Sequence, residues 1–279
     1  MSSDLQTRVI TAFFFVAVML AGIYFSVYSL WVLFGLINAL CIYEYQGIST
    51  KMPGNIPRHQ GSEAIFNVGM GTLIYLLITS ISLGWIPSYT LICLLPLLLV
   101  FFLKALFSHA ESPLTRLSSN LLGIFWITIP CSLFVPLSLV SGSFQPLMVI
   151  GAVLLVWGSD TFAYFSGRAF GKTSLFKRVS PKKTWEGSIG GMLACLIIAF
   201  LLSKIVPQWT WGEWSVIAVL AVVFGTLGDL VESLLKRSVK IKDSGNILPG
   251  HGGFLDRFDA LLFATPFIFT FVYLISRIA

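Results

Sequence analysis

The sequence predicts an all-α polytopic membrane protein with about nine transmembrane helices, and three observations support this prediction. Of 279 residues, 56% are hydrophobic and only 11% are charged, whereas soluble domains usually carry about 25% charged residues. The mean hydropathy is +0.88. Apolar runs of the roughly 17–25 residues that a helix needs to cross a bilayer recur along the whole chain. The chain is therefore not an ordinary soluble globule.

The expected helices follow the apolar runs in order. These runs fall near 9–26, 28–45, 64–85, 89–107, 119–140, 145–166, 188–206, 213–235 and 259–276. The first run, preceded by Arg8, could also be a signal peptide. No small-residue cleavage pattern closes it, however, and a second run begins almost at once, so we expect it to span the membrane.

The distribution of Lys and Arg predicts the orientation of the nine helices. If the N-terminus is cytoplasmic, 16 of the 18 Lys and Arg residues fall in inner segments, and only Lys204 and Arg277 fall outside. Because Lys and Arg accumulate in cytoplasmic loops, this separation supports an N-in, C-out arrangement. It also explains the net charge of +6 better than nucleic-acid binding does, since no basic run is interleaved with stacking aromatics.

The connections divide the chain into two regions. We expect an N-terminal transmembrane region of five helices over 1–140 and a C-terminal catalytic region of four helices over 141–279. Two inner connections of the second region, about 167–187 and 236–258, are long and strongly charged, as functional loops often are. The simpler alternative is that they are solvated basic loops.

Four aspartates in the C-terminal region are candidates for a metal site. Asp160 and Asp229 lie inside apolar runs, each about six residues or roughly 9 Å before the inner end. Asp256 and Asp259 lie at the inner start of the last run. Ionisable residues in a membrane span are costly and usually functional, and several carboxylates around one cavity suit Mg²⁺. Two alternatives stay open: Asp259 caps its helix or pairs with Arg257, and Asp160 pairs with Arg168.

Polar residues near these aspartates suit phosphate groups. Asp229, Glu232, Ser233 and Lys236 follow helical spacing and form one polar stripe. Lys182 and Lys183 precede a helix whose free N–H groups favour anions. Glycines 250, 252 and 253 allow close approach of the backbone to a ligand, and nearby His251 either contacts phosphate or braces the loop. Residues 171–173 are similar to the end of a P-loop, but the required earlier glycine is Ser166 and no strand precedes it.

With these residues in view, the chain resembles the phosphatidate cytidylyltransferase family, also called CDP-diacylglycerol synthases. The C-terminal signature of that family is matched at Ser233, Lys236, Arg237, Lys242, Asp243, Gly245, His251, Gly252, Gly253, Asp256, Arg257 and Asp259. Further family elements lie around Asp160 and from Ser180 to Gly191. The resemblance is specific over about 155–260 and only compositional before that.

The resemblance implies an enzyme that makes CDP-diacylglycerol and pyrophosphate from CTP and phosphatidate. It implies a homodimer, and we expect the inner membrane of a bacterium as its location. The distribution of Lys and Arg predicts that the active site faces the cytoplasm. Mg²⁺ is the implied cofactor, with a second cation left open. The matching positions imply that Asp229 and Asp256 hold the ion, and Asp160 and Asp259 are further candidate ligands. The catalytic candidates are Asp229, Lys236, Asp256 and Arg257, and the substrate-binding candidates are Lys182, Lys183, Ser233, Lys242, Asp243, His251, Gly252 and Gly253.

Two other functions share some of these features. A transporter for an anionic substrate would place polar groups near the bilayer midplane and show related halves, and the sequence shows neither feature. A CTP-using enzyme that acts on a different membrane lipid fits the same residues and stays open.

Overall fold

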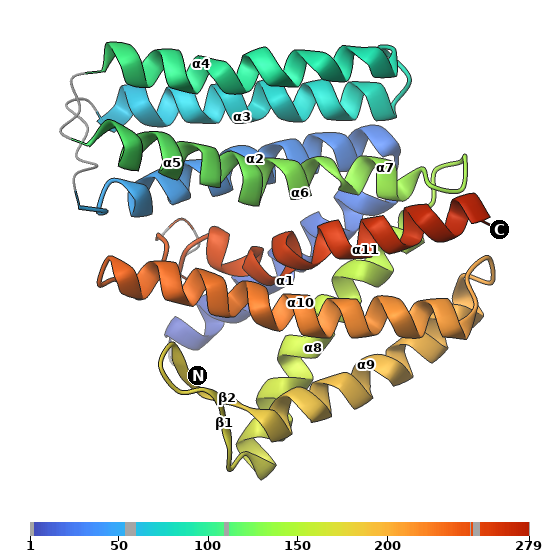
Figure 1. Cartoon of the computed structure of the whole chain (residues 1–279). Coiled ribbons are helices and arrows are strands. Elements are labelled where there is room, and N and C mark those ends of the chain that lie inside the picture. The colour runs from blue at the N-terminus through green and yellow to red at the C-terminus, as the bar shows by residue number, and fades with distance from the viewer. Residues whose placement is uncertain (1–2, 54–59, 109–111, 246, 248–251, 279) are drawn as a thin grey trace. The chain divides into compact units, whose positions relative to one another are not determined.

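The computed structural model describes residues 3–53, 60–108, 112–245, 247 and 252–278 (Figure 1). This part of the chain is mostly helical, which confirms the coarse prediction of fold class. One small difference lies in the first charged loop, where β1 (Ser174–Phe176) and β2 (Ser180–Thr184) form a two-stranded antiparallel sheet. The residues between the strands reverse the direction of the chain. The backbone groups of the two strands then pair with each other within the loop.

The chain divides into two compact units. The first unit is Met1–Pro136 with Ser238–Arg257, and the second is Leu137–Arg237 with Phe258–Ala279. In the first unit the helices are α1 (Ser3–Tyr24), α2 (Val27–Ser49), α3 (Gln60–Ser82), α4 (Leu94–Phe107), α5 (Pro113–Gly123) and α6 (Ile129–Ser132), and α7 (Phe134–Ser138) leads out of it. The second unit contains α8 (Pro146–Phe170), α9 (Trp185–Ile205), α10 (Trp211–Ser238) and α11 (Asp259–Ile278). The predicted division into 1–140 and 141–279 stays a prediction.

The described residues contain eight helical stretches that are long and apolar enough to cross a membrane, and Val9–Tyr24 of α1 is a shorter apolar helix. Together they correspond to the nine apolar runs of the sequence. The run expected over 119–140 differs most, because its helix begins at Pro113 and contains a π-helical turn at Ile124–Thr128. Pro130 and Pro136 follow, and each lacks an N–H and disturbs regular helix. The location of the N-terminus on the cytoplasmic side of the membrane stays a prediction.

The first unit packs around α2. Phe34 stacks on Phe134 with ring centroids 3.8 Å apart, and the Tyr45 hydroxyl donates to the Ser119 carbonyl oxygen at 3.0 Å. In Figure 1, α3 and α4 lie side by side. This packing fixes α2, whose C-terminal end carries Glu44, a residue of the second charged loop's support described below.

The second unit depends on a close approach of α8 and α9, and Figure 1 shows the end of α8 and the beginning of α9 together beside the hairpin. A Cβ added at Gly187 would lie 2.7 Å from the Ala163 carbonyl oxygen, and one at Gly191 would lie 2.9 Å from the Ser159 carbonyl oxygen. Small residues allow membrane helices to approach in this way. The beginning of α9 is thereby held against the C-terminal half of α8.

Candidate functional site

A charged pocket of about 420 Å³ lies in the second unit, where α8, β2, α9 and α10 meet. Its lining consists of Asp160, Ala163, Tyr164, Gly167, Arg168, Lys182, Lys183, Thr184, Gly187, Ser188, Thr226 and Asp229. The pocket combines three cationic side chains with two carboxylates. Four of the residues that we predicted from the sequence, namely Asp160, Lys182, Lys183 and Asp229, line this one cavity.

An ion pair between Lys183 and Asp229 joins β2 to α10 across the charged pocket. Both side chains are partly exposed, at 25% for Lys183 and 31% for Asp229. The Asp229 carboxylate also accepts a hydrogen bond from the Ser233 hydroxyl at 3.3 Å. Because the pair borders an open cavity, an incoming anion can approach the Lys183 ammonium and a cation can approach the carboxylate.

The beginning of α9 and the β-hairpin hold the two lysines in place. Thr184 caps α9 by accepting a hydrogen bond from the Gly187 N–H at 3.2 Å. The Glu186 carboxylate accepts hydrogen bonds from the N–H groups of Lys172 and Thr173, each at 3.1 Å. The expected placement of the two lysines directly before a helix is confirmed, since β2 ends at Thr184.

The predicted polar stripe on α10 separates into two pairs. Asp229 lines the charged pocket and accepts the hydrogen bond from Ser233, whereas the Lys236 ammonium donates to the Glu232 carboxylate at 2.7 Å. Glu232 is only 1% exposed and Lys236 only 8%. Lys236 is not among the residues that line the charged pocket, and its predicted catalytic role stays a prediction.

The other two aspartates of the second unit differ in exposure. Asp160 is exposed at the charged pocket, and no ion pair joins it to Arg168 among the described residues. Asp259 is buried, and its carboxylate accepts a hydrogen bond from the Ala260 N–H at 2.7 Å. A Cβ added at Gly228 of α10 would lie 2.8 Å from the Asp259 carbonyl oxygen. Asp259 therefore begins α11 where that helix packs on α10.

In the first unit, Asp256 organises the second charged loop. Its carboxylate accepts hydrogen bonds from the Ser244 N–H at 3.1 Å and from the Gly253 N–H at 2.9 Å. Gly252 has a φ of 81°, a conformation that L-residues with side chains rarely adopt. At Gly252 the loop therefore adopts a backbone conformation that favours glycine, as predicted.

Three more predicted residues of this loop are exposed, and one lies outside the residues that the structure describes. Lys242, Asp243 and Arg257 are exposed. His251 lies outside the described residues, so its predicted role in binding or bracing stays a prediction.

Glu44 on α2 is a site residue that the sequence analysis missed. It is 4% exposed, and its carboxylate accepts hydrogen bonds from the Ser244 hydroxyl at 3.0 Å and the Leu255 N–H at 2.8 Å. These bonds connect α2 to both sides of the loop that Asp256 organises. The sequence does indicate Glu44, because it is an ionisable residue inside the run expected over 28–45 and such residues are usually functional.

A divalent cation fits the chemistry of the charged pocket. Mg²⁺ typically takes one or two carboxylates together with substrate phosphates, and Asp160 and Asp229 supply two carboxylates there. Asp229 already forms an ion pair with the Lys183 ammonium, so its carboxylate attracts a positively charged group. Within the described residues, no three His, Cys, Asp or Glu side chains form a metal-binding group. That all four aspartates bind the metal ion stays a prediction.

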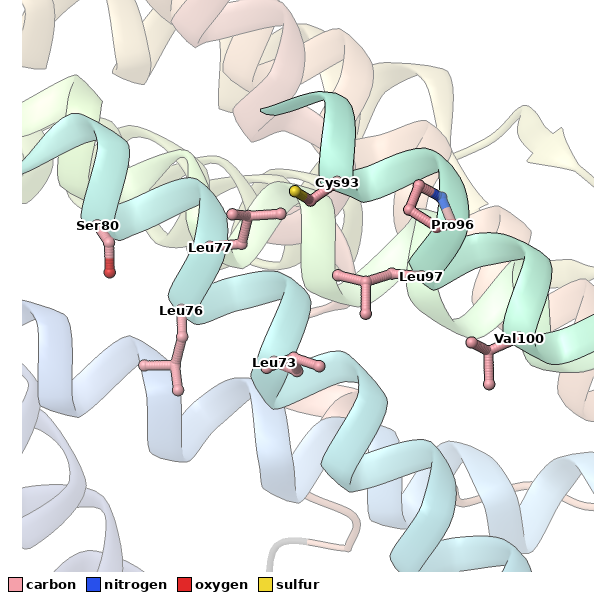
Figure 2. A pocket seen from close by; sticks show the side chains of 8 residues that line it. All are labelled: Leu73, Leu76, Leu77, Ser80, Cys93, Pro96, Leu97 and Val100. Carbon is pink, nitrogen blue, oxygen red and sulfur yellow. The ribbon is translucent and has the colours of Figure 1, made fainter. Parts of the chain in front are cut away.

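Two hollows of the first unit differ in polarity. One, of about 430 Å³, is lined by parts of α2, α3 and the second charged loop, including Glu44 and Ser244. The other, of about 490 Å³, lies between α3 and α4 and is lined by Leu73, Leu76, Leu77, Ser80, Cys93, Pro96, Leu97 and Val100. Figure 2 shows Leu77 and Cys93 pointing toward each other across this second hollow. Because no charged side chain lines it, it does not suit a nucleotide.

Comparison with known proteins places these residues in a family. A phosphatidate cytidylyltransferase of Haemophilus influenzae is 42% identical over 133 residues, which is 46% of each chain. One of Bacillus subtilis is 46% identical over 127 residues, covering 45% of this chain and 47% of the relative. Phosphatidate cytidylyltransferase 5, chloroplastic, of Arabidopsis thaliana is 35% identical over 189 residues, covering 57% and 46%.

In these alignments the chain spans about half the length of the curated relatives it matches. The family model described as "Cytidylyltransferase family" matches a much longer part, residues 6–275. The match therefore includes both units and the two charged loops. The resemblance drawn from the sequence is confirmed at this level: the chain belongs to the Cytidylyltransferase family.

Proposed function

We propose that this protein is a phosphatidate cytidylyltransferase, which transfers CMP from CTP to phosphatidate and releases pyrophosphate. The observation that carries the proposal is the charged pocket, in which Lys182, Lys183 and Arg168 lie with Asp160 and Asp229. The names of the curated relatives support the same activity. A site of this kind at the end of apolar helices suits one water-soluble and one lipid substrate.

The proposed reaction is an in-line displacement at phosphorus. A phosphate oxygen of phosphatidate forms a bond to the α-phosphorus of CTP, the bond from that phosphorus to the bridging α–β oxygen breaks, and pyrophosphate leaves with its electron pair. The nucleophile is already an anion near neutral pH, so no strong general base is needed. The main difficulty is to bring two polyanions together in the correct orientation.

The cationic residues of the charged pocket address this difficulty. Lys182, Lys183 and Arg168 offset the repulsion between the two substrates, and the N-terminus of α9 adds backbone N–H groups that favour phosphate. Lys183 can exchange its partner from Asp229 to a phosphate, because the pair borders the cavity. Lys236, which pairs with Glu232, remains a proposed catalytic residue.

Mg²⁺ is the proposed cofactor, with Asp160 and Asp229 as its ligands in the charged pocket. When bound, it neutralises charge on the triphosphate and on the leaving pyrophosphate. Asp256 and Asp259 remain proposed ligands on the basis of the family signature, together with a second cation. Lys242, Asp243, His251, Gly252, Gly253 and Arg257 remain proposed substrate-binding or catalytic residues of the second charged loop.

The proposed setting is the inner membrane of a bacterium, with the charged pocket at the cytoplasmic face and the protein as a homodimer. The distribution of Lys and Arg supports this orientation. CTP would then reach the pocket from the cytoplasm, while phosphatidate would reach it from the inner leaflet.

Pyrophosphate release by the purified protein tests the proposed function. We expect release only when CTP, phosphatidate and Mg²⁺ are all present, and little release with ATP or GTP. A panel with an ether lipid phosphate and a polyprenyl phosphate examines the alternative lipid substrates. Absence of release with phosphatidate, or equal release with a polyprenyl phosphate, would contradict the proposal.

A further inference from the structure

An apolar groove of about 520 Å³ lies beside the charged pocket in the second unit. It is lined by the hairpin, the first three turns of α9 and the middle of α10, at Leu175, Phe176, Trp185, Ser188, Ile189, Met192, Leu193, Val222, Val223, Thr226, Leu227 and Leu230. No charged side chain lines the groove. Its volume lies within the range of about 300–1,000 Å³ that is usual for ligand pockets.

The groove and the charged pocket meet at two residues. Ser188 of α9 and Thr226 of α10 line both cavities. One ligand can therefore place an anionic group beside Lys183 and an apolar chain along α9 and α10, with its polar linkage near the two hydroxyl groups. This is the distribution of polarity along a phospholipid.

The hollow in Figure 2 shows why this continuity matters. That hollow is also apolar and has a similar volume of about 490 Å³, but it shares no lining residue with the charged pocket or with the hollow beside Glu44. An apolar hollow between membrane helices is not informative by itself, because lipid-facing surfaces are apolar everywhere. The groove on α9 and α10 differs because it opens into a set of charged residues.

We propose that this groove binds one acyl chain of the lipid substrate, with Ser188 and Thr226 beside its glycerol ester. The proposal rests on the proposed function and extends it by naming where the lipid lies. Because an acyl chain is already in an apolar solvent in the bilayer, the groove contributes little net affinity. Its contribution is orientation, since a held chain places the phosphate of the lipid beside Lys183.

Two matched substitutions on α10 test the proposal through substrate preference. Val223 lines the groove and is 42% exposed, whereas Val219, one turn earlier, does not line it and is 41% exposed. We expect Val223→Trp to fill the groove and to lower the ratio of kcat/KM for dioleoyl over dihexanoyl phosphatidate about tenfold. Val219→Trp should leave that ratio and the KM for CTP unchanged. Equal ratios in Val223→Trp and the wild type would overturn the proposal.

A second pair of substitutions on α9 repeats the comparison on the opposite wall. Ile189 lines the groove and Ile197 does not, and both are exposed. Ile189→Trp should reproduce the effect of Val223→Trp, and Ile197→Trp should behave like the wild type. A change of the same size in Ile197→Trp would mean that any bulky residue on these helices disturbs the enzyme, and it would overturn the assignment to the groove.

Photolabelling in nanodiscs separates failure of the groove from failure of the proposed function. Phosphatidate with a diazirine in one acyl chain should label α9 and α10 residues of the groove. Excess phosphatidate should reduce the labelling and phosphatidylcholine should not. Labelling without turnover would support the groove while the proposed reaction fails. Turnover with equal competition by both lipids would overturn the groove alone.

The same face could instead contact a second copy of the chain. A disulfide between two Val223→Cys chains, absent from the parent protein with its four native cysteines, would identify an interface and overturn the proposal. We expect no such crosslink.

Discussion

Two buried or partly buried carboxylates hold the second charged loop in the first unit. Asp256 accepts hydrogen bonds from the N–H groups of Ser244 and Gly253, while Glu44 accepts from the Ser244 hydroxyl and the Leu255 N–H. Ser244 is the shared residue, with its N–H on Asp256 and its hydroxyl on Glu44. A residue of α2 therefore fixes the conformation of a loop about 200 positions later in the chain.

Replacement of Glu44 tests this support of the loop. Glu44→Ala leaves the buried Ser244 hydroxyl and Leu255 N–H without the acceptor, and we expect a loss of about 1–3 kcal/mol in the free energy of unfolding. Glu44→Gln keeps one acceptor oxygen and should lose less. Thermal unfolding in detergent measures both variants. Equal stability of Glu44→Ala and the wild type would contradict the assigned role.

Replacement of Lys183 tests its proposed role in binding CTP. Lys183→Met removes a cation from the charged pocket and leaves Asp229 without its ion pair. We expect kcat/KM for CTP to fall about 100-fold, or about 2.7 kcal/mol of transition-state stabilisation. Lys204→Met, on the same chain but at the other end of α9, is the control and should retain activity. Similar kinetics for the two variants would remove Lys183 from the proposed mechanism.

The sequence predicted these residues to different degrees, for physical reasons. Asp160 and Asp229 were identifiable because a carboxylate is costly in a membrane span. The pairing of Lys183 with Asp229 was not identifiable, because it depends on the register of the hairpin and on the approach of β2 to α10. The same applies to Lys236, whose burial with Glu232 depends on how α10 packs.

At the scale of elements, the contact between α8 and α9 determines the shape of the charged pocket. Gly167 and Gly171 of the α8 end lie against Thr184, and Gly187 lies against Ala163. Long apolar runs predicted the helices well, because spanning length and hydropathy are properties of the local sequence. The hairpin and the π-helical turn were not predicted, since short irregular elements depend on tertiary context.

Substitution of glycine at this contact tests its importance. Gly187→Ala places a Cβ 2.7 Å from the Ala163 carbonyl oxygen, so α9 must shift. We expect a loss of about 1–3 kcal/mol in stability and a lower kcat, because Thr184 and Lys183 move with α9. Gly212→Ala is the control, since its nearest neighbour would lie 3.9 Å away. Unfolding curves and turnover rates of the two variants check this expectation; a wild-type kcat in Gly187→Ala would contradict it.

At the scale of the whole molecule, the proposed function requires the charged pocket to lie on the cytoplasmic side of the membrane. Sixteen of 18 Lys and Arg residues fall on one side when nine helices cross with the N-terminus inside. The number of apolar helices is consistent with the sequence, but the direction of each crossing comes only from the charge distribution.

Cysteine accessibility tests the orientation. In a background without the four native cysteines, Lys177→Cys in the hairpin turn should react with an impermeant maleimide only in inside-out vesicles. Ser143→Cys, between α7 and α8, should react only in right-side-out vesicles. The reverse pattern would place the charged pocket outside and contradict the proposed access of CTP from the cytoplasm.

If the charged pocket is the site at which CMP is transferred to phosphatidate, Asp229→Asn should nearly abolish the formation of CDP-diacylglycerol. Product is measured by mass spectrometry after incubation of the wild type and the variant with CTP, phosphatidate and Mg²⁺, with thermal unfolding as the check on folding. We expect product from the wild type and a rate at least about 100-fold lower, equivalent to about 2.7 kcal/mol, from the folded variant. A folded Asp229→Asn protein that forms product at the wild-type rate would contradict it.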